Sequence, residues 1–371
     1  MSAVLDLFLE LAAIPSPPGD ERAVSDRVTA ELRELGLEVN EDGTGPEIGS
    51  NAGNLLCRLE PTNEGLPIFL CAHLDTVPPQ GPLEPVVEDG VVRNAGGTIL
   101  GADNKAAVAV MLEGARRLLE ESRPHAGVEL LFTQKEEVGL RGAYAFDWTR
   151  LAARHGFVYD QGTPIGEIVL GAPYAFAFDV TFRGQAAHAG MAPEDGRSAI
   201  AAAARAIADL RLGRIDEETS ANVGTIEGGT ARNIVPDRCQ LTVEARSHNE
   251  RKLADLIEEM SETLAFAASL EDCSVETTME RSYRGYRFGR EDVPVRLART
   301  ALERAGFTPS FALSGGGADA NVFNERGLEC VNLANGMAAI HSPEEHIAVA
   351  DLEAMVEITL ALVDAARETS L

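Results

Sequence analysis

Ile68-Phe-Leu-Cys-Ala-His73-Leu-Asp75 is an apolar run that closes on a histidine and, two residues later, on an aspartate. Short apolar runs of this kind are typical of buried strands. Similar strand-like runs lie at residues 54–59, 128–133 and 157–159, and helical patterns lie at residues 22–35 and 105–121. Alternation of helices with short strands predicts an α/β fold with a mostly parallel central sheet flanked by helices.

Five metal-binding side chains stand at the ends of such runs, in the chain order His73, Asp103, Glu137, Asp160 and His341. Sites in open α/β sheets gather at the carboxyl ends of the strands, so we expect these side chains to meet. Two imidazoles and three carboxylates fill two adjacent zinc positions when one carboxylate bridges, which leaves Glu136 free for proton transfer. The pattern therefore predicts a two-zinc amide hydrolase.

The pattern of elements changes near residue 173. Strand-like runs at 175–182, 221–226, 240–245 and 274–281 alternate with helical patterns at 197–212 and 252–270. This composition predicts a compact α+β unit. The alternation of helices with short buried strands resumes with a helix at 293–305 and a strand at 329–333. We expect a discontinuous catalytic domain of residues 1–172 and 289–371, with a smaller domain inserted at 173–288.

Composition narrows the function classes. The chain of 371 residues has 59 acidic against 32 basic residues and a net charge of −27, which disfavours nucleic-acid partners. The charge either keeps an abundant protein in solution or marks a salt-rich cytoplasm. No apolar run reaches the roughly 18 to 20 residues of a membrane helix, and the N-terminal stretch, with Asp6 and Glu10, is no secretory signal. Five scattered cysteines predict reduced thiols and a cytoplasmic location.

Eight short motifs in one order resemble those of the peptidase T branch of the dizinc exopeptidase and aminoacylase family, and the match as a whole runs from about residue 5 to the end. The motifs are His73-Leu-Asp75-Thr-Val-Pro, Gly101-Ala-Asp103-Asn-Lys105, Glu136-Glu137-Val-Gly with Asp160 beyond it, Ala187-His188-Ala-Gly190, Gly228-Gly-Thr-Ala-Arg232-Asn233-Ile-Val-Pro236, Glu244-Ala-Arg246-Ser-His248, Ser314-Gly-Gly-Gly-Ala-Asp319-Ala-Asn321 and His341-Ser-Pro-Glu344.

The resemblance implies two zinc ions per subunit, although manganese and cobalt also accept such ligands. It assigns one zinc to His73 and Asp160 and the other to Glu137 and His341, with Asp103 as the bridge. It also implies a cis peptide bond after Asp103. The inserted domain would act as a lid and dimerisation domain, so the partners expected are a short peptide substrate and a second copy of the chain.

Two acidic residues are predicted to be catalytic. Asp75 shares a strand face with His73, so its carboxylate should accept a hydrogen bond from the ring and set the tautomer. Glu136 alternates away from Glu137 and is expected to act as general base on the bridging water, then to return the proton to the leaving amine. Taken alone, the two glutamates would be a solvated charge pair and Asp160 a loop acid.

Five residues are predicted to bind substrate. The resemblance implies that His188, from the lid of a second subunit, stabilises the tetrahedral intermediate. Arg246, with Asn233, is expected to hold the substrate α-carboxylate, the alternative being a surface ion pair of Arg246 with Glu244 or a neighbouring acid. Backbone amides at Gly316 and Gly317 would approach the substrate, unless the triple glycine is only a flexible loop.

Three functions fit these residues. The leading one is an aminopeptidase that removes the N-terminal residue of short peptides, in particular tripeptides. The alternative is an N-acyl-amino-acid deacylase or a carboxypeptidase, which would share every zinc ligand. The third is a metal-stabilised scaffold without catalysis, and the presence of Glu136 argues against it.

Overall fold

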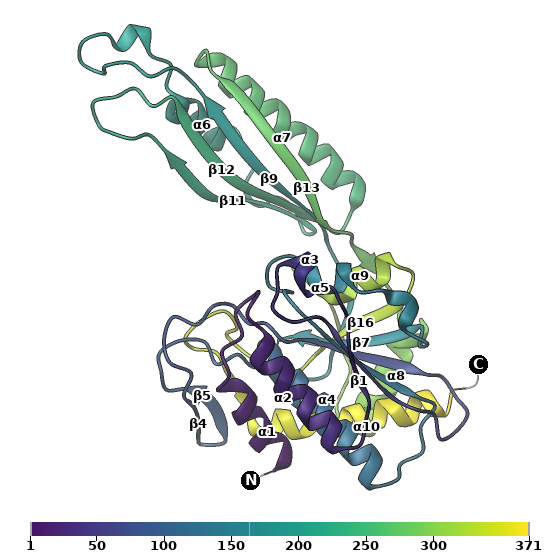
Figure 1. The fold of residues 1–371 in the computed structure, drawn as a ribbon. Coiled ribbons are helices and arrows are strands. Elements are labelled where there is room, and N and C mark those ends of the chain that lie inside the picture. The colour runs from purple at the N-terminus through teal and green to yellow at the C-terminus, as the bar shows by residue number, and fades with distance from the viewer. Residues whose placement is uncertain (1, 163, 370–371) are drawn as a thin grey trace. The chain divides into compact units, whose positions relative to one another are not determined.

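The computed structural model describes residues 2–162 and 164–369 and separates into two compact units (Figure 1). One unit comprises Met1–Gly171 and Arg287–Leu371, and the other comprises Ala172–Tyr286. Each unit has its own cluster of buried apolar side chains. The predicted fold class, a discontinuous α/β unit with an inserted α+β unit, is confirmed.

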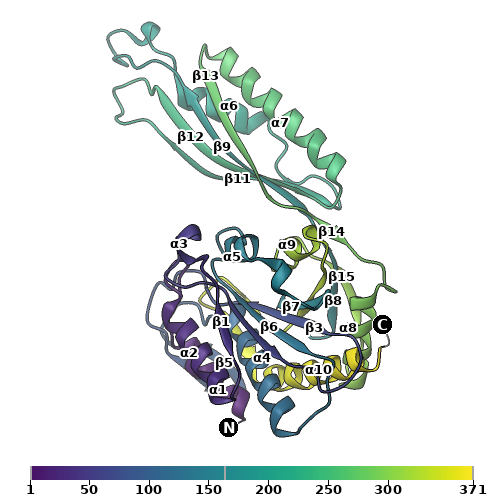
Figure 2. The same ribbon diagram turned by 45° about the vertical axis from the view of Figure 1, so that its right-hand side comes forward.

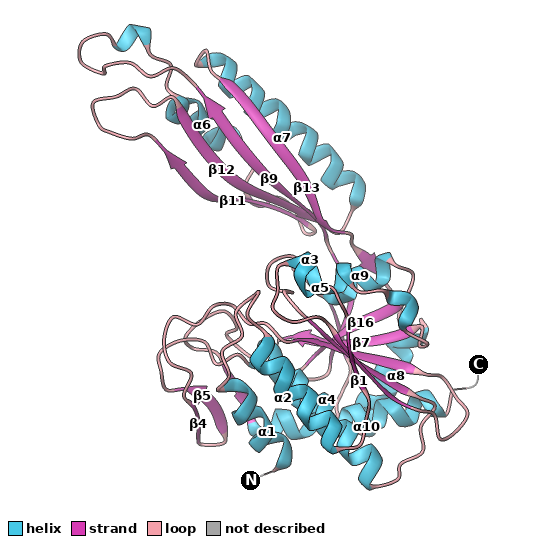
Figure 3. Ribbon diagram, viewed as in Figure 1, coloured by secondary structure: helices cyan, strands magenta, loops and turns pink. Residues whose placement is uncertain are grey.

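A mixed nine-stranded sheet is the centre of the first unit (Figure 3). Its path runs β1-β2-β6-β3-β7-β16-β8-β14, and β15 pairs with β8. The middle strands β6, β3, β7 and β16 are parallel to one another. The strand bounds are β1 Val39–Glu41, β2 Leu55–Leu59, β3 Ile68–His73, β6 Val128–Thr133, β7 His155–Gln161, β8 Glu167–Ala172, β14 Tyr286–Arg287, β15 Ser310–Leu313 and β16 Glu329–Ala334.

Helices cover both faces of this sheet (Figure 2). Successive side chains of a strand point to opposite faces. On β3, Leu70 belongs to the main core with α4, whereas Phe69 packs edge-on against Phe323 of α9. The helix bounds are α1 Ala3–Ala12, α2 Arg22–Glu34, α3 Gly45–Ile48, α4 Ala102–Glu120, α5 Arg141–Ala145, η1 Trp148–Arg150, α8 Val293–Arg304, α9 Asp319–Glu325 and α10 Val349–Arg367.

A small second sheet belongs to the same unit. It has the order β17-β5-β4, with β4 at Pro85–Glu88, β5 at Val91–Asn94 and β17 at His346–Ala348. The β17–β5 pairing brings the segment after His341 back to residues 91–93. Neither this sheet nor α9 and α10 is among the elements predicted above, which is the main omission of the sequence analysis.

The inserted unit is a five-stranded antiparallel sheet with the order β10-β11-β12-β9-β13. Two helices, α6 and α7, pack on this sheet and supply alanines and leucines to its core. The bounds are β9 Tyr174–Arg183, η2 Pro193–Asp195, α6 Ala199–Asp209, β10 Gly213–Arg214, β11 Thr219–Gly228, β12 Arg238–Ser247, α7 Glu250–Leu270 and β13 Ser274–Tyr283. In the described part of the chain, no helix combines the length and apolarity that a bilayer crossing requires.

Candidate metal centre

The five predicted ligands all belong to the first unit, and the parallel strands determine where most of them lie. His73 is the last residue of β3, Asp160 lies near the end of β7, and Glu137 follows the end of β6. Asp103 lies in the first turn of α4, where its backbone is not helical, and the peptide bond from Asp103 to Asn104 is cis, as the resemblance implies. The carboxyl edge of the sheet therefore brings these segments together.

Asp103 lies between the two imidazoles. Its Oδ1 is 3.1 Å from Nε2 of His73, and its Oδ2 is 3.3 Å from Nε2 of His341. Nε2 of His341 is also 3.1 Å from the Glu137 carboxylate, and Nε2 of His73 is 3.8 Å from Oδ1 of Asp160. One carboxylate thus presents a separate oxygen to each half of the cluster, which suits a ligand shared by two metal ions.

Ligand atoms of these residues are close enough for metal coordination. Atoms of His73, Glu136 and Asp160 lie within 4.8 Å of one another, and so do atoms of His73, Asp103 and Glu137. In the described part of the chain, the cations paired with Asp103, Glu137 and Asp160 are the two imidazoles alone. A nearly buried acidic cluster of this kind calls for more positive charge, and imidazole and carboxylate are common ligands of zinc and manganese. The residues present therefore fit a pair of divalent metal ions.

The pKa values reflect the same crowding. Burial and the neighbouring charge of Asp103 raise the pKa of Asp160 to about 8. Burial also raises the pKa of Glu136 well above its usual range, with further increases from Asp160 and other acids. Hydrogen bonds to Asp103 and Glu137 raise the pKa of His341 to about 10. In the metal-free protein, protons bound to these side chains would reduce the repulsion between the carboxylates.

Asp75 contacts its neighbours differently from the prediction. Nδ1 of His73 lies 2.8 Å from the backbone carbonyl oxygen of Asp75 and 3.5 Å from its Oδ1, so the shorter bond is to the carbonyl. The ring still donates from Nδ1 and leaves Nε2 for the metal side. The Asp75 carboxylate instead accepts the backbone N–H groups of Glu136 (2.9 Å) and Glu137 (3.1 Å).

The segment that carries Glu136 and Glu137 is a tight turn. Lys135 and Leu140 have left-handed backbones with φ of 53° and 58°. The carbonyl oxygen of Glu136 accepts the N–H groups of Gly139 and Leu140. His341 is also left-handed, with φ of 61°. Non-glycine residues rarely adopt this conformation, and such residues concentrate at functional sites.

The predicted substrate residues divide between the units. Gly316 and Gly317 lie between β15 and α9 in the first unit, where the Gly316 N–H donates to Ser314 Oγ. His188 and Asn233 lie on adjacent segments of the inserted unit, because the Ala189 N–H donates to the Asn233 carbonyl oxygen. Arg246, on β12, donates to Glu244 at 2.9 Å, which is the ion pair named above as the alternative. The roles of all five stay predictions.

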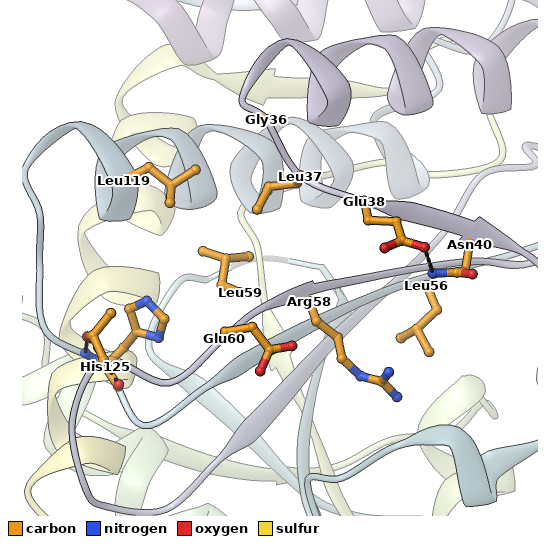
Figure 4. Close-up of a pocket in the computed structure, with 11 residues that line it drawn as sticks. Gly36, Leu37, Glu38, Asn40, Leu56, Arg58, Leu59, Glu60, Leu119 and His125 are labelled. Atoms are coloured by element: carbon orange, nitrogen blue, oxygen red, sulfur yellow. Dashed lines mark hydrogen bonds between the residues drawn. The ribbon is translucent and has the colours of Figure 1, made fainter.

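The pocket drawn in Figure 4 lies away from these residues. It has a volume of about 460 Å³ and is lined by parts of β1 and β2 and by Leu119 and His125, not by any predicted ligand. Glu38 and Asn40 in its wall are hydrogen-bonded to each other. Its lining contains no convergent set of metal-binding or catalytic groups, so the strand-end cluster is the better candidate for the active site.

The sequence analysis missed several residues that brace the cluster. Asn332 of β16 forms a reciprocal pair with the backbone of Asp160, accepting its N–H and donating to its carbonyl oxygen, each at 2.8 Å. Glu345 accepts the Asp103 N–H at 2.9 Å. Asp319 is buried and accepts from Thr133. Nothing in the spacing marks Asn332 or Glu345, whereas Asp319 stood within a quoted motif.

Fold and cluster together define a metal-dependent hydrolase, and comparisons with known proteins agree. A model of the peptidase dimerisation domain matches residues 171–269, and one of peptidase family M28 matches residues 54–156. The chain is 38% identical to the uncharacterized protein YqjE of Bacillus subtilis (strain 168), over 98% of both chains.

Two solved structures are similar over nearly their whole length. Aminopeptidase PepT from Bacillus cereus is 40% identical with a TM-score of 0.89, over 98% of both chains. A tripeptidase from Staphylococcus aureus is 34% identical with a TM-score of 0.94, over 99% of this chain and 98% of the other. This chain belongs to the M20 family of metallopeptidases, in its peptidase T-like branch, and is therefore a hydrolase of peptide bonds.

Proposed function

We propose that the protein is a dinuclear metal aminopeptidase that removes the N-terminal residue of tripeptides. The observation that carries this proposal is the position of Asp103, whose two carboxylate oxygens face the imidazoles of His73 and His341. The similarity to an aminopeptidase and a tripeptidase supports the substrate class. Zinc is the metal proposed, and manganese or cobalt would suit the same ligands.

The chain's own residues supply binding and proton transfer. His73 and Asp160 would hold one metal and Glu137 and His341 the other, with Asp103 shared. Bound divalent metals at such a site polarise the scissile carbonyl and lower the pKa of a water. Glu136, whose pKa burial raises, would accept the proton from the attacking water and deliver it to the leaving amine nitrogen. Asp75 would hold the turn that carries Glu136 by accepting its backbone N–H.

Substrate binding and assembly are assigned to the inserted unit and the glycine loop. Arg246 and Asn233 would bind the α-carboxylate of the peptide, His188 would stabilise the tetrahedral intermediate from a second subunit, and Gly316 and Gly317 would offer backbone N–H groups. The match of residues 171–269 to a peptidase dimerisation domain supports a homodimer formed through this unit. All five cysteines are free thiols, which supports a cytoplasmic location.

Hydrolysis of a tripeptide and of its N-acetylated form separates the proposal from its nearest alternative. An aminopeptidase needs the free amino group, so acetylation should abolish cleavage of the first peptide bond. Release of acetate or another acyl group, with the peptide itself resistant, would instead identify an N-acyl-amino-acid deacylase. Release of the C-terminal residue would identify a carboxypeptidase.

The third candidate function is not enzymatic: the protein would be a metal-stabilised scaffold without catalysis. It predicts full metal binding and no turnover of any amide in a broad substrate library. The position of Glu136, with ligand atoms within 4.8 Å of those of His73 and Asp160, favours catalysis instead.

A further inference from the structure

Glu345 joins two segments of the candidate metal centre. Its Oε2 accepts the backbone N–H groups of Leu100 (2.7 Å) and Gly101 (2.8 Å), and its Oε1 accepts the N–H of Asp103 (2.9 Å). These three donors lie around the start of α4, where Gly101 has a left-handed φ of 78° that glycine adopts without strain. One carboxylate therefore holds the backbone that presents the Asp103 side chain.

Burial of the Glu345 carboxylate costs free energy, which its hydrogen bonds must offset. The residue is only 2% exposed, and burial of an ionised carboxylate must be compensated by hydrogen bonds or opposite charge. Three hydrogen bonds from N–H donors, together with attraction to the fully buried Lys105, offset part of that cost. The Lys105 ammonium donates in turn to the carbonyl oxygen of Ile14.

Glu345 also belongs to the loop that carries His341. The Glu345 N–H donates to the carbonyl oxygen of Ser342, and the neighbouring His346 forms a backbone bridge with Ala338. The loop thus closes on itself between residues 338 and 346, with His341 inside it. Through Glu345 this closed loop is tied to the backbone of Asp103, whose Oδ2 lies 3.3 Å from Nε2 of His341.

We propose that Glu345 is a positioning residue that sets the distance between Asp103 and His341. It thereby determines the metal affinity of the position held by Glu137 and His341. This inference rests on the proposed function, because it requires that metal binds between these side chains. No role in substrate contact is assigned to Glu345: it acts through the backbone of Asp103 and through its own loop.

Two substitutions of Glu345 distinguish its role as a hydrogen-bond acceptor from a role in filling space. In Glu345→Gln, one carboxylate oxygen becomes an NH₂ group, which faces an N–H donor and leaves at least one buried backbone donor without an acceptor. Glu345→Asp keeps both acceptor oxygens on a side chain shorter by one methylene. Glu129→Gln is the matched control, since Glu129 is also buried and accepts a backbone N–H, from Ala153 at 2.8 Å.

The experiment is a competition titration of the metal-free protein with zinc against a chromogenic chelator, accompanied by circular dichroism of each metal-free variant. Wild type should bind two zinc ions. Glu345→Gln should bind one of the two ions about 10- to 100-fold less tightly, the usual effect of removing a residue that orients a ligand. Glu345→Asp should fall between wild type and Glu345→Gln, and Glu129→Gln should match wild type. Excess zinc should restore peptidase activity to Glu345→Gln.

Wild-type zinc affinity at both positions in folded Glu345→Gln would overturn the inference. If Glu345→Gln does not fold, Glu345→Asp decides: weakened binding of one zinc supports the positioning role, and unchanged binding refutes it. Failure of the wild type itself to bind two metal ions would refute the proposed function, a result distinct from two-metal binding that is insensitive to residue 345.

Discussion

The carboxylate of Asp75 accepts the backbone N–H of Glu136 at 2.9 Å, while its backbone carbonyl oxygen lies 2.8 Å from Nδ1 of His73. One fully buried residue therefore orients a predicted metal ligand and the predicted general base. The tautomer of His73 depends on the Asp75 backbone, whereas the position of Glu136 depends on the Asp75 side chain. Substitution of Asp75 should affect these two functions unequally.

Asp75→Asn should lower kcat more than it weakens metal binding. The asparagine keeps the backbone carbonyl oxygen that His73 contacts. In its side chain, however, an NH₂ donor replaces one of the two oxygens that accept the N–H groups of Glu136 and Glu137. We expect kcat to fall by about 10- to 100-fold, as for other orienting residues. Asp42→Asn is the control, because Asp42 likewise accepts two backbone N–H groups away from the cluster. Equal losses in both variants would count against the special role of Asp75.

The metal-free protein should lose stability as the pH rises from 5 to 8. Asp160 has a folded pKa of about 8 against an ordinary value of 3.8, so across this interval the folded state binds more protons than the unfolded state. The raised pKa of His341, about 10 against 6.5, has the same sign: its stabilisation is complete below about pH 6.5 and declines above it.

Urea denaturation of chelator-treated protein at several pH values measures this dependence. Asp160→Asn lacks the titrating carboxyl and should lose less stability between pH 5 and 8 than the wild type. Metal-loaded protein should also show a flatter profile, since bound metal replaces the protons. A metal-free protein that is more stable at pH 8 than at pH 5 would contradict the assignment of the cluster.

Arg246→Ala should raise KM for a tripeptide by roughly 10- to 100-fold, because a hydrogen bond to a charged group contributes about 1.5 to 3 kcal/mol. The KM for the corresponding peptide amide, which lacks the carboxylate, should change little. Arg205→Ala is the control, since Arg205 forms a surface pair with Glu271 at 2.8 Å in the same unit. The same increase in KM for both substrates would assign Arg246 to structure through Glu244.

Gly156→Ala should destabilise the first unit. Gly156 of β7 pairs with Phe69 of β3, and a Cβ added there would stand 2.0 Å from Cζ of the buried Phe69 ring. Overpacking of this kind typically costs about 1 to 3 kcal/mol of unfolding free energy. Gly43→Ala, where an added Cβ meets nothing within 4 Å, should leave the urea midpoint nearly unchanged. Equal urea midpoints for the two variants would show that the structure accommodates the added methyl group next to Phe69 without loss of stability.

Some of this structure follows from local sequence and some does not. The strands at 68–73 and 128–133 were predicted with the bounds they have, because both are mostly apolar runs buried on both faces. The helix α10 was missed because its apolar residues are not confined to one stripe, so its helical period is weak. The β17–β5 pairing joins segments about 250 residues apart, and no local pattern marks such a contact.

The same limit applies to the candidate site. His73, Glu137 and Asp160 stand at strand ends, so their convergence could be predicted from the order of strands and the site rule for parallel sheets. Glu345 and Asn332 could not, because their importance lies in backbone donors and acceptors that come close only after folding. Asp75 was expected beside His73 because the two residues share a strand face, yet which oxygen atom of Asp75 contacts the ring depends on the turn that follows β6.

Metal content measured together with tripeptide turnover, on the wild type and on Glu136→Gln, tests the central claim most directly. The cluster geometry predicts two metal ions per chain in both proteins. It also predicts a kcat for Glu136→Gln that is lower by about 10²- to 10⁴-fold, the usual contribution of a positioned general base. A wild type that cleaves tripeptides without bound metal, or a Glu136→Gln variant with undiminished kcat, would contradict it.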